Sequence, residues 1–100
     1  MVASATTLPS RARVVVIGGG IIGCSIAYHL AAMGWNDVVL VERDQVTSGT
    51  TWHAAGLMVT FGSLSETSTR MRQYTRDLYG RLEAETGQAT GLKLCGFVEL

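Results

Sequence analysis

A glycine-rich turn between a β-branched run and an uncharged helical segment is the feature that most constrains this fold. Residues 13–17 read Arg-Val-Val-Val-Ile. This run has no polar alternation, which is typical of a strand buried on both faces of a parallel sheet. Gly18, Gly20 and Gly23 follow at once, in the spacing Gly-x-Gly-x-x-Gly. The pattern predicts a strand that ends at the glycines and a helix that begins on them.

A helix and a second strand complete the expected βαβ unit. The helix is predicted over residues 21–33, and Gly34 suits the left-handed position that ends a helix. Its apolar stripe contains Ile22, Ile26, Leu30 and Met33. Residues 38–41 form another β-branched run. Together these segments predict an α/β fold with a Rossmann-like unit and a right-handed crossover.

The glycine spacing indicates a site for the pyrophosphate of a dinucleotide. Gly18 would permit the tight turn, Gly20 would let the backbone approach the phosphates, and Gly23 would let helix and strand pack closely. The phosphates would meet free N–H groups at the positive end of the helix, which begins with Ile21 and Ile22.

Glu42 ends the second strand, nineteen residues beyond Gly23. A carboxylate in this position can accept both ribose hydroxyls of the adenosine, and it repels a 2′-phosphate. The pattern therefore disfavours NADP, but it does not separate FAD from NAD, because both contain the ADP half.

The second half of the chain is expected to hold a loop, a long helix and a strand. Residues 43–62 are rich in Ser, Thr and Gly and have no hydrophobic period, as in a loop. Ser63 as N-cap and Glu66 match a capping box, which predicts a helix over residues 64–86, closed by Gly87. Its apolar stripe contains Met71, Tyr74, Leu78 and Leu82. Residues 92–100 are predicted to form a strand, bulged at Gly96.

Composition narrows the class of protein. The chain has 100 residues and a formal net charge of zero, which allows at most one domain and points away from nucleic acid or an anionic membrane as partner. Residues 14–36 carry no formal charge and follow Arg11 and Arg13, as in a membrane span or signal peptide. Three consecutive glycines would break the helix that both alternatives require. Cys24 and Cys95 are expected to be inert thiols rather than a disulfide.

The residues after Glu42 narrow the choice of cofactor. Residues 41–44 read Val-Glu-Arg-Asp, and residues 47–57 read Thr-Ser-Gly-Thr-Thr-Trp-His-Ala-Ala-Gly-Leu. Together they resemble the FAD-dependent amine oxidoreductases of the sarcosine and dimethylglycine dehydrogenase family. The similarity extends over about residues 8–100. It implies an FAD-binding fold of the glutathione-reductase and D-amino-acid-oxidase type.

The resemblance also implies roles for particular residues. In this family the histidine of the Trp-His step is bonded through a ring nitrogen to the 8α carbon of FAD, and His53 occupies that position. The loop before it lies along the cofactor, which implies contacts from Ser48, Thr50 and Thr51, with Arg43 also included. Neutral imidazole is a reasonable nucleophile toward an oxidised flavin. The alternative is a loop histidine that makes only local hydrogen bonds, since some relatives bind FAD without a covalent link.

Other conspicuous side chains are expected to be structural. His29 lies inside the crossover helix. Trp52 is expected to pack beside the flavin, or else in a core. Arg70, Arg72 and Arg76 are expected on the solvated side of the long helix.

The reaction implied by the resemblance is oxidative demethylation of an N-methylated glycine, sarcosine or dimethylglycine, with the flavin as hydride acceptor. Electron-transfer flavoprotein or oxygen would be the final acceptor, and a further domain could bind tetrahydrofolate. Substrate and acid–base residues would lie beyond Leu100, so no catalytic residue and no metal ligand is assigned. The alternatives are a deaminating amino-acid oxidase of the same fold, a non-catalytic regulatory subunit, and an NAD-dependent dehydrogenase.

The chain is expected to be a piece of a larger enzyme. Residues 1–10 are interpreted as a leader and residues 11–100 as the N-terminal part of an FAD-dependent oxidoreductase domain. Two parallel strands and one helix leave sheet edges open, and the sequence ends within a predicted strand. The alternative is a complete small protein. The short leader favours a bacterial-type cytoplasmic protein, whereas eukaryotic relatives would work in the mitochondrial matrix.

Overall fold

The structure is a computed structural model that describes residues 7–62 and 64–98. The chain divides into two compact units, Met1–Ala55 and Gly56–Leu100, and each is described by itself. In the described residues, no helix is both long enough and apolar enough to cross a membrane.

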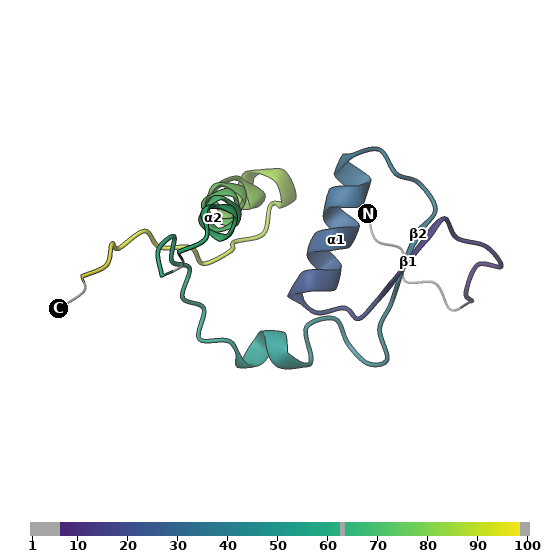
Figure 1. Cartoon of the computed structure of the whole chain (residues 1–100). Coiled ribbons are helices and arrows are strands. Elements are labelled where there is room, and N and C mark those ends of the chain that lie inside the picture. Colours follow the sequence, from purple (N-terminus) through teal and green to yellow (C-terminus); the bar gives the residue numbers. More distant parts are fainter. Residues whose placement is uncertain (1–6, 63, 99–100) are drawn as a thin grey trace. The chain divides into compact units, whose positions relative to one another are not determined.

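The first unit contains the predicted βαβ arrangement (Figure 1). Strand β1 (Val14–Ile17) leads into helix α1 (Ile21–Ala32), and strand β2 (Val38–Val41) returns parallel to β1. The register pairs Val14 with Val38 and Ile17 with Val41. The carboxyl ends of both strands therefore lie at one edge of the sheet, beside the glycine turn. The α/β fold and the Rossmann-like unit are confirmed.

Helix α1 is closed by Gly34, as the sequence predicts, but its last helical residue is Ala32, one residue earlier than expected. Gly34 has a φ of 79°, in the left-handed region that glycine adopts without strain. Its N–H donates to the carbonyl of Ala31 at 2.9 Å, and the N–H of Trp35 donates to the carbonyl of Leu30 at 2.9 Å. This pair of bonds is a Schellman motif, which satisfies the last carbonyls of the helix.

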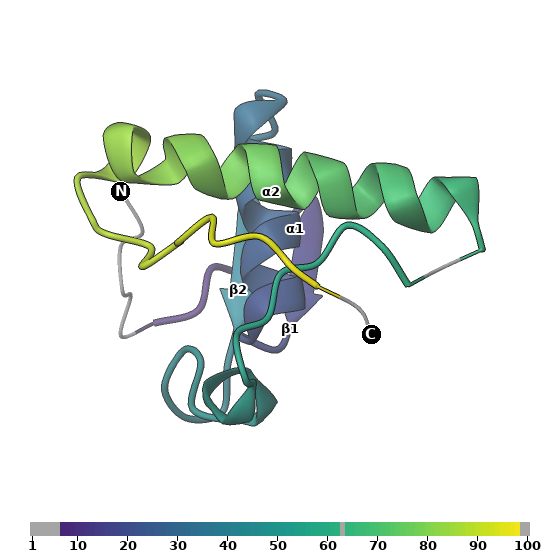
Figure 2. The same ribbon diagram turned by 90° about the vertical axis from the view of Figure 1, so that its left-hand side faces the viewer.

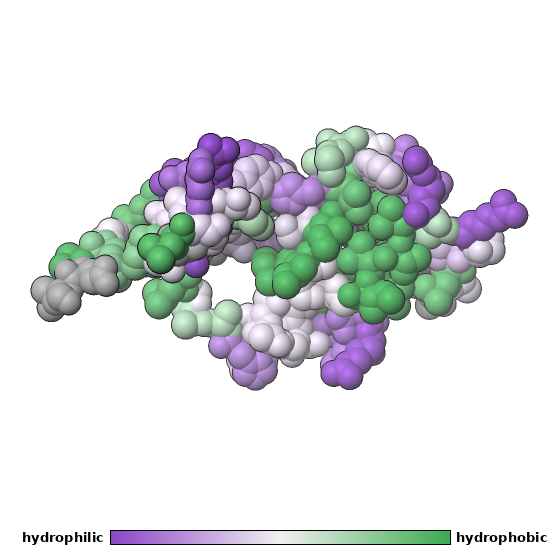
Figure 3. Space-filling model, in the orientation of Figure 1, coloured by the Kyte–Doolittle hydropathy of each residue, from purple (hydrophilic) through white to green (hydrophobic). Residues whose placement is uncertain are grey.

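The face of α1 that packs on the sheet differs from the predicted stripe. Gly23 is the residue of α1 that is buried, and Val16 of β1 is buried beside it. Ile22 is 73% exposed, and Ile26 and Met33 also remain exposed. The helix is apolar on several faces, so a period of 3.6 residues could not identify the buried one. Figure 3 shows hydrophobic side chains gathered on the surface over α1.

The second unit is built on helix α2 (Glu66–Thr86), which begins two residues later than predicted. Its N-cap is Ser65, whose hydroxyl accepts the N–H of Ser68 at 3.4 Å. The predicted cap, Ser63, lies outside the described residues. Glu66 becomes the first helical residue and forms an ion pair with Arg70 at 2.6 Å, so the capping-box prediction is wrong. Gly87 closes the helix with a φ of 73°, as predicted.

The strand predicted over residues 92–100 is wrong for the part that the structure describes. Residues 92–98 form no β-ladder, although Gly96 adopts a φ of 76°. Strands need a hydrogen-bonded neighbour, and no strand is assigned between residues 56 and 98 among those described. Figure 2 shows this segment as an irregular trace after α2. It is held instead by stacking of Phe97 on Phe61, with ring centroids 4.1 Å apart.

Candidate functional site

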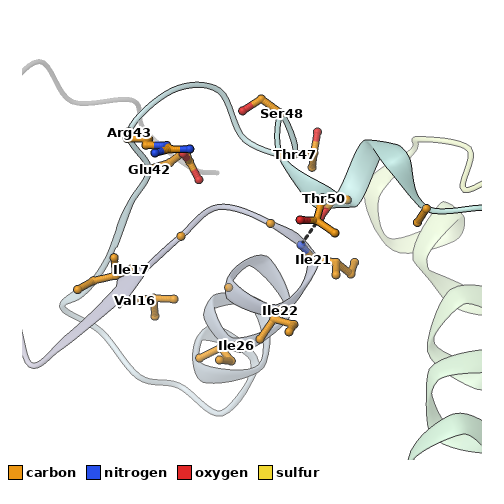
Figure 4. Close-up of a pocket in the computed structure, with 16 residues that line it drawn as sticks. Val16, Ile17, Ile21, Ile22, Ile26, Glu42, Arg43, Thr47, Ser48 and Thr50 are labelled. Carbon is orange, nitrogen blue, oxygen red and sulfur yellow. Dashed lines mark hydrogen bonds between the residues drawn. The ribbon is translucent and has the colours of Figure 1, made fainter.

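An open groove of about 710 Å³ lies at the carboxyl end of the sheet, between the start of α1 and the loop after β2 (Figure 4). It brings together ten of the eleven residues predicted to contact the cofactor: Gly18, Gly20, Ile21, Ile22, Gly23, Glu42, Arg43, Ser48, Thr50 and Thr51. His53 is the one that does not line it.

Gly23 makes the close approach of helix and turn possible. A Cβ atom on this residue would lie 1.8 Å from the carbonyl oxygen of Gly18 and 3.4 Å from Cγ1 of Val16. Gly18 itself has a φ of 104°, which side chains rarely allow. The sequence expectation for Gly23, close packing of the helix on the strand, agrees with this geometry.

The first turn of α1 leaves backbone donors at the groove. The first α-helical hydrogen bond runs from the N–H of Cys24 to the carbonyl of Gly20, at 2.9 Å. The N–H groups of Ile22 and Gly23 precede this bond and have no partner within the helix. The N–H of Ile21, which the sequence predicted to be free for the phosphates, donates instead to the Thr51 hydroxyl. Helix-dipole charge adds to these donors, so this end of the groove favours an anion.

Glu42 is held by the backbone of the glycine turn. Its Oε2 accepts the N–H of Gly19 at 2.7 Å, and its Oε1 accepts the N–H of Asp44 at 3.2 Å. The bond from Gly19, followed by that from Asp44, lowers the pKa of the Glu42 carboxyl, because both stabilise the charged form. A charged, pre-oriented carboxylate therefore stands at the end of β2.

Sequence reasoning missed Gly19, which is the variable position of the glycine motif. Gly19 is buried, and a Cβ atom on it would lie 3.1 Å from Cβ of Glu42. Its carbonyl accepts the N–H of Thr47 at 2.9 Å and the thiol of Cys24 at 3.4 Å. No periodic or motif signal marks this position, because its role depends on segments distant in the sequence.

Thr47 was also missed. Its φ of 70° is unusual for a β-branched residue, and such strain persists only where the surroundings impose it. The hydrogen bond from its N–H to Gly19 holds the loop after β2 against the glycine turn.

A short 3-10 helix, η1 (Thr50–His53), interrupts the segment predicted to be loop. Within it, the Thr51 hydroxyl accepts the N–H of Ile21 at 2.9 Å, the bond drawn in Figure 4. The His53 side chain is exposed, and its Nδ1 lies 3.0 Å from the carbonyl oxygen of Gly49. Trp52 is 71% exposed, so the described residues form no core around it. Its ring lies 4.9 Å from that of His53, centroid to centroid.

The residues predicted to be structural mostly behave as expected. Nδ1 of His29 bonds the carbonyl of Ser25 at 2.6 Å within α1. Cys24 and Cys95 are free thiols, and Cys95 is exposed. Arg72 departs from the prediction, because its guanidinium donates to the carbonyl of Phe61 and its side chain is half-buried. Among the described residues, no cluster of His, Cys, Asp or Glu could hold a metal ion.

The groove combines a glycine turn, a helix start with unpaired backbone N–H groups and a carboxylate at the end of a strand. Comparison with known proteins identifies the family. The sequence pattern of the FAD dependent oxidoreductase family matches residues 13–100. This chain belongs to the FAD dependent oxidoreductase family. The match covers the whole βαβ unit, the groove and α2.

Three known proteins are similar to this chain over most of its length. The chain is 51% identical, over 89 residues, to 4-methylaminobutanoate oxidase (formaldehyde-forming) of Paenarthrobacter nicotinovorans, covering 89% of this chain and 11% of that protein. It is 43% identical, over 98 residues, to the mitochondrial pyruvate dehydrogenase phosphatase regulatory subunit of Mus musculus, covering 98% and 11%. It is 47% identical, over 90 residues, to the mitochondrial dimethylglycine dehydrogenase of Rattus norvegicus, covering 90% and 10%. The chain therefore spans about a tenth of the length of these relatives.

Proposed function

We propose that the groove holds the ADP half of FAD. One observation carries this proposal: the donor end of α1 and the Glu42 carboxylate line the same groove. A pyrophosphate needs the donors, and a ribose needs the acceptor. The residues present fit both requirements.

The charges at the two ends of the groove, the start of α1 and the end of β2, support one orientation of the bound ADP. Ile22 and Gly23 offer backbone N–H groups and the positive helix end to the phosphates. Glu42 is charged at neutral pH, and the backbone bonds that lower its pKa favour that charged form further. Its carboxylate would repel an anion and accept hydrogen bonds from hydroxyl groups. The sugar would therefore lie toward β2 and the phosphates toward α1.

His53 is proposed as the covalent attachment point of the flavin. A carbonyl oxygen only accepts, so the 3.0 Å contact with Gly49 requires the proton of the neutral ring on Nδ1. The Nε2 lone pair is then free to act as nucleophile. The position of His53 outside the groove lining agrees with this role, because the isoalloxazine lies at the far end of FAD from the adenine.

The activity proposed for the whole protein is oxidation of an N-methylated amine, with sarcosine or dimethylglycine as substrate. Bound FAD supplies the hydride acceptor in such a reaction. Residues of this chain would bind and orient the cofactor, and none of them is proposed as an acid or base. Electron-transfer flavoprotein or oxygen as final acceptor, and tetrahydrofolate on another domain, complete the proposal.

A non-catalytic regulatory role is the second candidate. It is favoured by the 43% identity to the mouse phosphatase regulatory subunit, a protein whose name denotes regulation rather than oxidation. Both candidates use the same FAD-binding fold, so only flavin chemistry separates them. Bleaching of the flavin by dimethylglycine in the absence of oxygen would favour the enzyme.

The proposed organisation is that residues 1–10 form a leader and residues 11–100 the N-terminal part of a longer FAD-dependent oxidoreductase. The protein would work in the bacterial cytoplasm, or in the mitochondrial matrix if it is eukaryotic. The 100-residue chain alone is expected to be inactive.

Acid precipitation of the full-length protein tests the FAD attachment. The wild-type precipitate should remain yellow, and His53→Ala should release all its flavin to the supernatant while still binding it before precipitation. His29→Gln, which changes the other histidine of the chain, should keep the colour in the pellet. Release of flavin from the wild-type pellet would refute the His53 assignment, and absence of flavin before precipitation would refute the FAD site.

A further inference from the structure

We infer that Thr51 is a positioning residue, whose hydroxyl fixes η1 against the start of α1 and thereby sets where His53 meets the flavin. This inference rests on the proposed function of the groove and of His53. It assigns to Thr51 a role in the rate of covalent attachment that is separate from a direct contact with the cofactor.

The turn that carries His53 is closed on itself. Nδ1 of His53 bonds the carbonyl of Gly49, and the N–H of Ala54 donates to the carbonyl of Thr51 at 3.3 Å. Both contacts lie within residues 49–54, so they hold the imidazole in the turn but do not fix the turn against α1.

The Thr51 hydroxyl bonds η1 itself to α1, in addition to the bond from the N–H of Thr47 to Gly19, which holds the preceding loop. Among the described residues, it makes the one side-chain hydrogen bond by which η1 reaches another element, the 2.9 Å bond from the N–H of Ile21. Ile21 and Thr51 are 30 positions apart in the sequence, so this bond joins distant segments. Only Trp52 separates Thr51 from His53, and a displacement of Thr51 therefore moves the imidazole directly.

The groove explains why this distance matters. The phosphates would be held at the first turn of α1, and the chain that joins them to the flavin ring limits how far the ring can lie from that turn. The 8α carbon would therefore be found only within a limited distance of α1. Thr51 is bonded to that same turn of α1, so both His53 and the phosphates of the cofactor would be positioned relative to the first turn of α1.

The attachment step places a strict demand on that position. A bond forms between Nε2 of His53 and the 8α carbon, and one C–H bond of the 8α methyl group breaks. That hydrogen and the ring proton of the imidazole leave as protons, and the electron pair passes through the flavin to dioxygen, which with two protons gives hydrogen peroxide. Misplacement by about 1 Å can slow such a reaction about a hundredfold.

The test is the rate of attachment in full-length apoprotein mixed with FAD. Thr51→Val removes the hydroxyl and keeps the shape of the side chain, whereas Thr51→Ser keeps the hydroxyl. Non-covalent binding is measured by quenching of FAD fluorescence, and attachment by the acid-stable flavin at successive times. Thr67→Val is the matched control, since Thr67 is exposed and its side chain makes no hydrogen bond among the described residues.

We expect Thr51→Val to attach FAD about ten- to hundredfold more slowly, with its dissociation constant for FAD changed less than about threefold. Thr51→Ser and Thr67→Val should attach it at close to the wild-type rate. An unchanged rate in Thr51→Val would overturn the inference, and so would a loss of binding as large as the loss of rate, since Thr51 would then be an ordinary cofactor contact or needed for folding. Wild-type protein without acid-stable flavin would overturn the His53 assignment together with this one.

Discussion

At the scale of single residues, the site depends on two features that act at very short range. Gly23 has no room for a methyl group, and Glu42 is oriented by two backbone N–H groups. The motif spacing predicted both residues as parts of the site. It did not predict Gly19 as the donor that holds Glu42, because glycine at the second position of the motif carries no signal of its own.

Gly23→Ala should destabilise the protein strongly. The added Cβ would lie 1.8 Å from a backbone oxygen that cannot move without displacing the turn. The free energy of unfolding should fall by about 1–3 kcal/mol or more, since overpacking typically costs this much. Urea unfolding measures it, with Gly80→Ala as control.

Gly80 lies within α2 and has open space around it. Its replacement by alanine should raise stability by about 0.5–1 kcal/mol, because alanine has the higher helix propensity. If Gly23→Ala unfolds at the same urea concentration as the wild type, the close approach of helix and turn at Gly23 is contradicted.

Glu42→Gln should change the acid dependence of stability. The pKa of Glu42 is lowered in the folded state, so its contribution to stability is present above the unfolded value, about 4.3, and is lost as pH falls through the folded value. The glutamine variant lacks this ionisation, so its stability should fall less steeply below about pH 5. Thermal midpoints between pH 7 and pH 3 test the sign, and identical slopes for both proteins would contradict it.

At the scale of elements, β1, α1 and β2 were predicted within one residue at each end, because strands of β-branched residues and a glycine turn are local signals. The start of α2 was not, because two serines compete for the N-cap and the sequence pattern favoured the wrong one. The bond from the Ser68 N–H to Ser65 decides between them. The orientation of α1 also escaped prediction, since an apolar helix offers no unique buried face.

Ser65→Ala should destabilise α2 through loss of the cap. The expected cost is about 0.5–1 kcal/mol, the lower part of the usual range, because the cap bond is long at 3.4 Å. Chemical denaturation measures it. Ser68→Ala, which replaces a serine of the first turn without removing the cap, should cost less, and the reverse order would place the N-cap elsewhere.

At the scale of the whole molecule, the two units offer little enclosed volume. Val16 and Leu78 are the buried hydrophobic side chains among the described residues, whereas Ile17 is 87% exposed. The groove that the first unit forms is open to solvent.

The 100-residue chain is therefore expected to bind FAD only weakly. An open groove leaves most of the ligand in water, and tight cofactor sites bury most of the ligand surface. Quenching of FAD fluorescence on titration with the chain measures this, with bovine serum albumin as the control for non-specific quenching. Stoichiometric binding at micromolar concentrations would contradict the expectation.

The sequence by itself determined the βαβ unit, the start of α1 at the glycine turn and the carboxylate at the end of β2. Each of these follows from residues within a few positions of one another, through strand preference, glycine geometry and the helix dipole. Only the tertiary structure decided that Gly19 orients Glu42, that Thr47 holds the loop and that Thr51 reaches Ile21. Those contacts join segments 23–30 residues apart, and no local preference of the chain specifies which distant N–H group a side chain or carbonyl will meet.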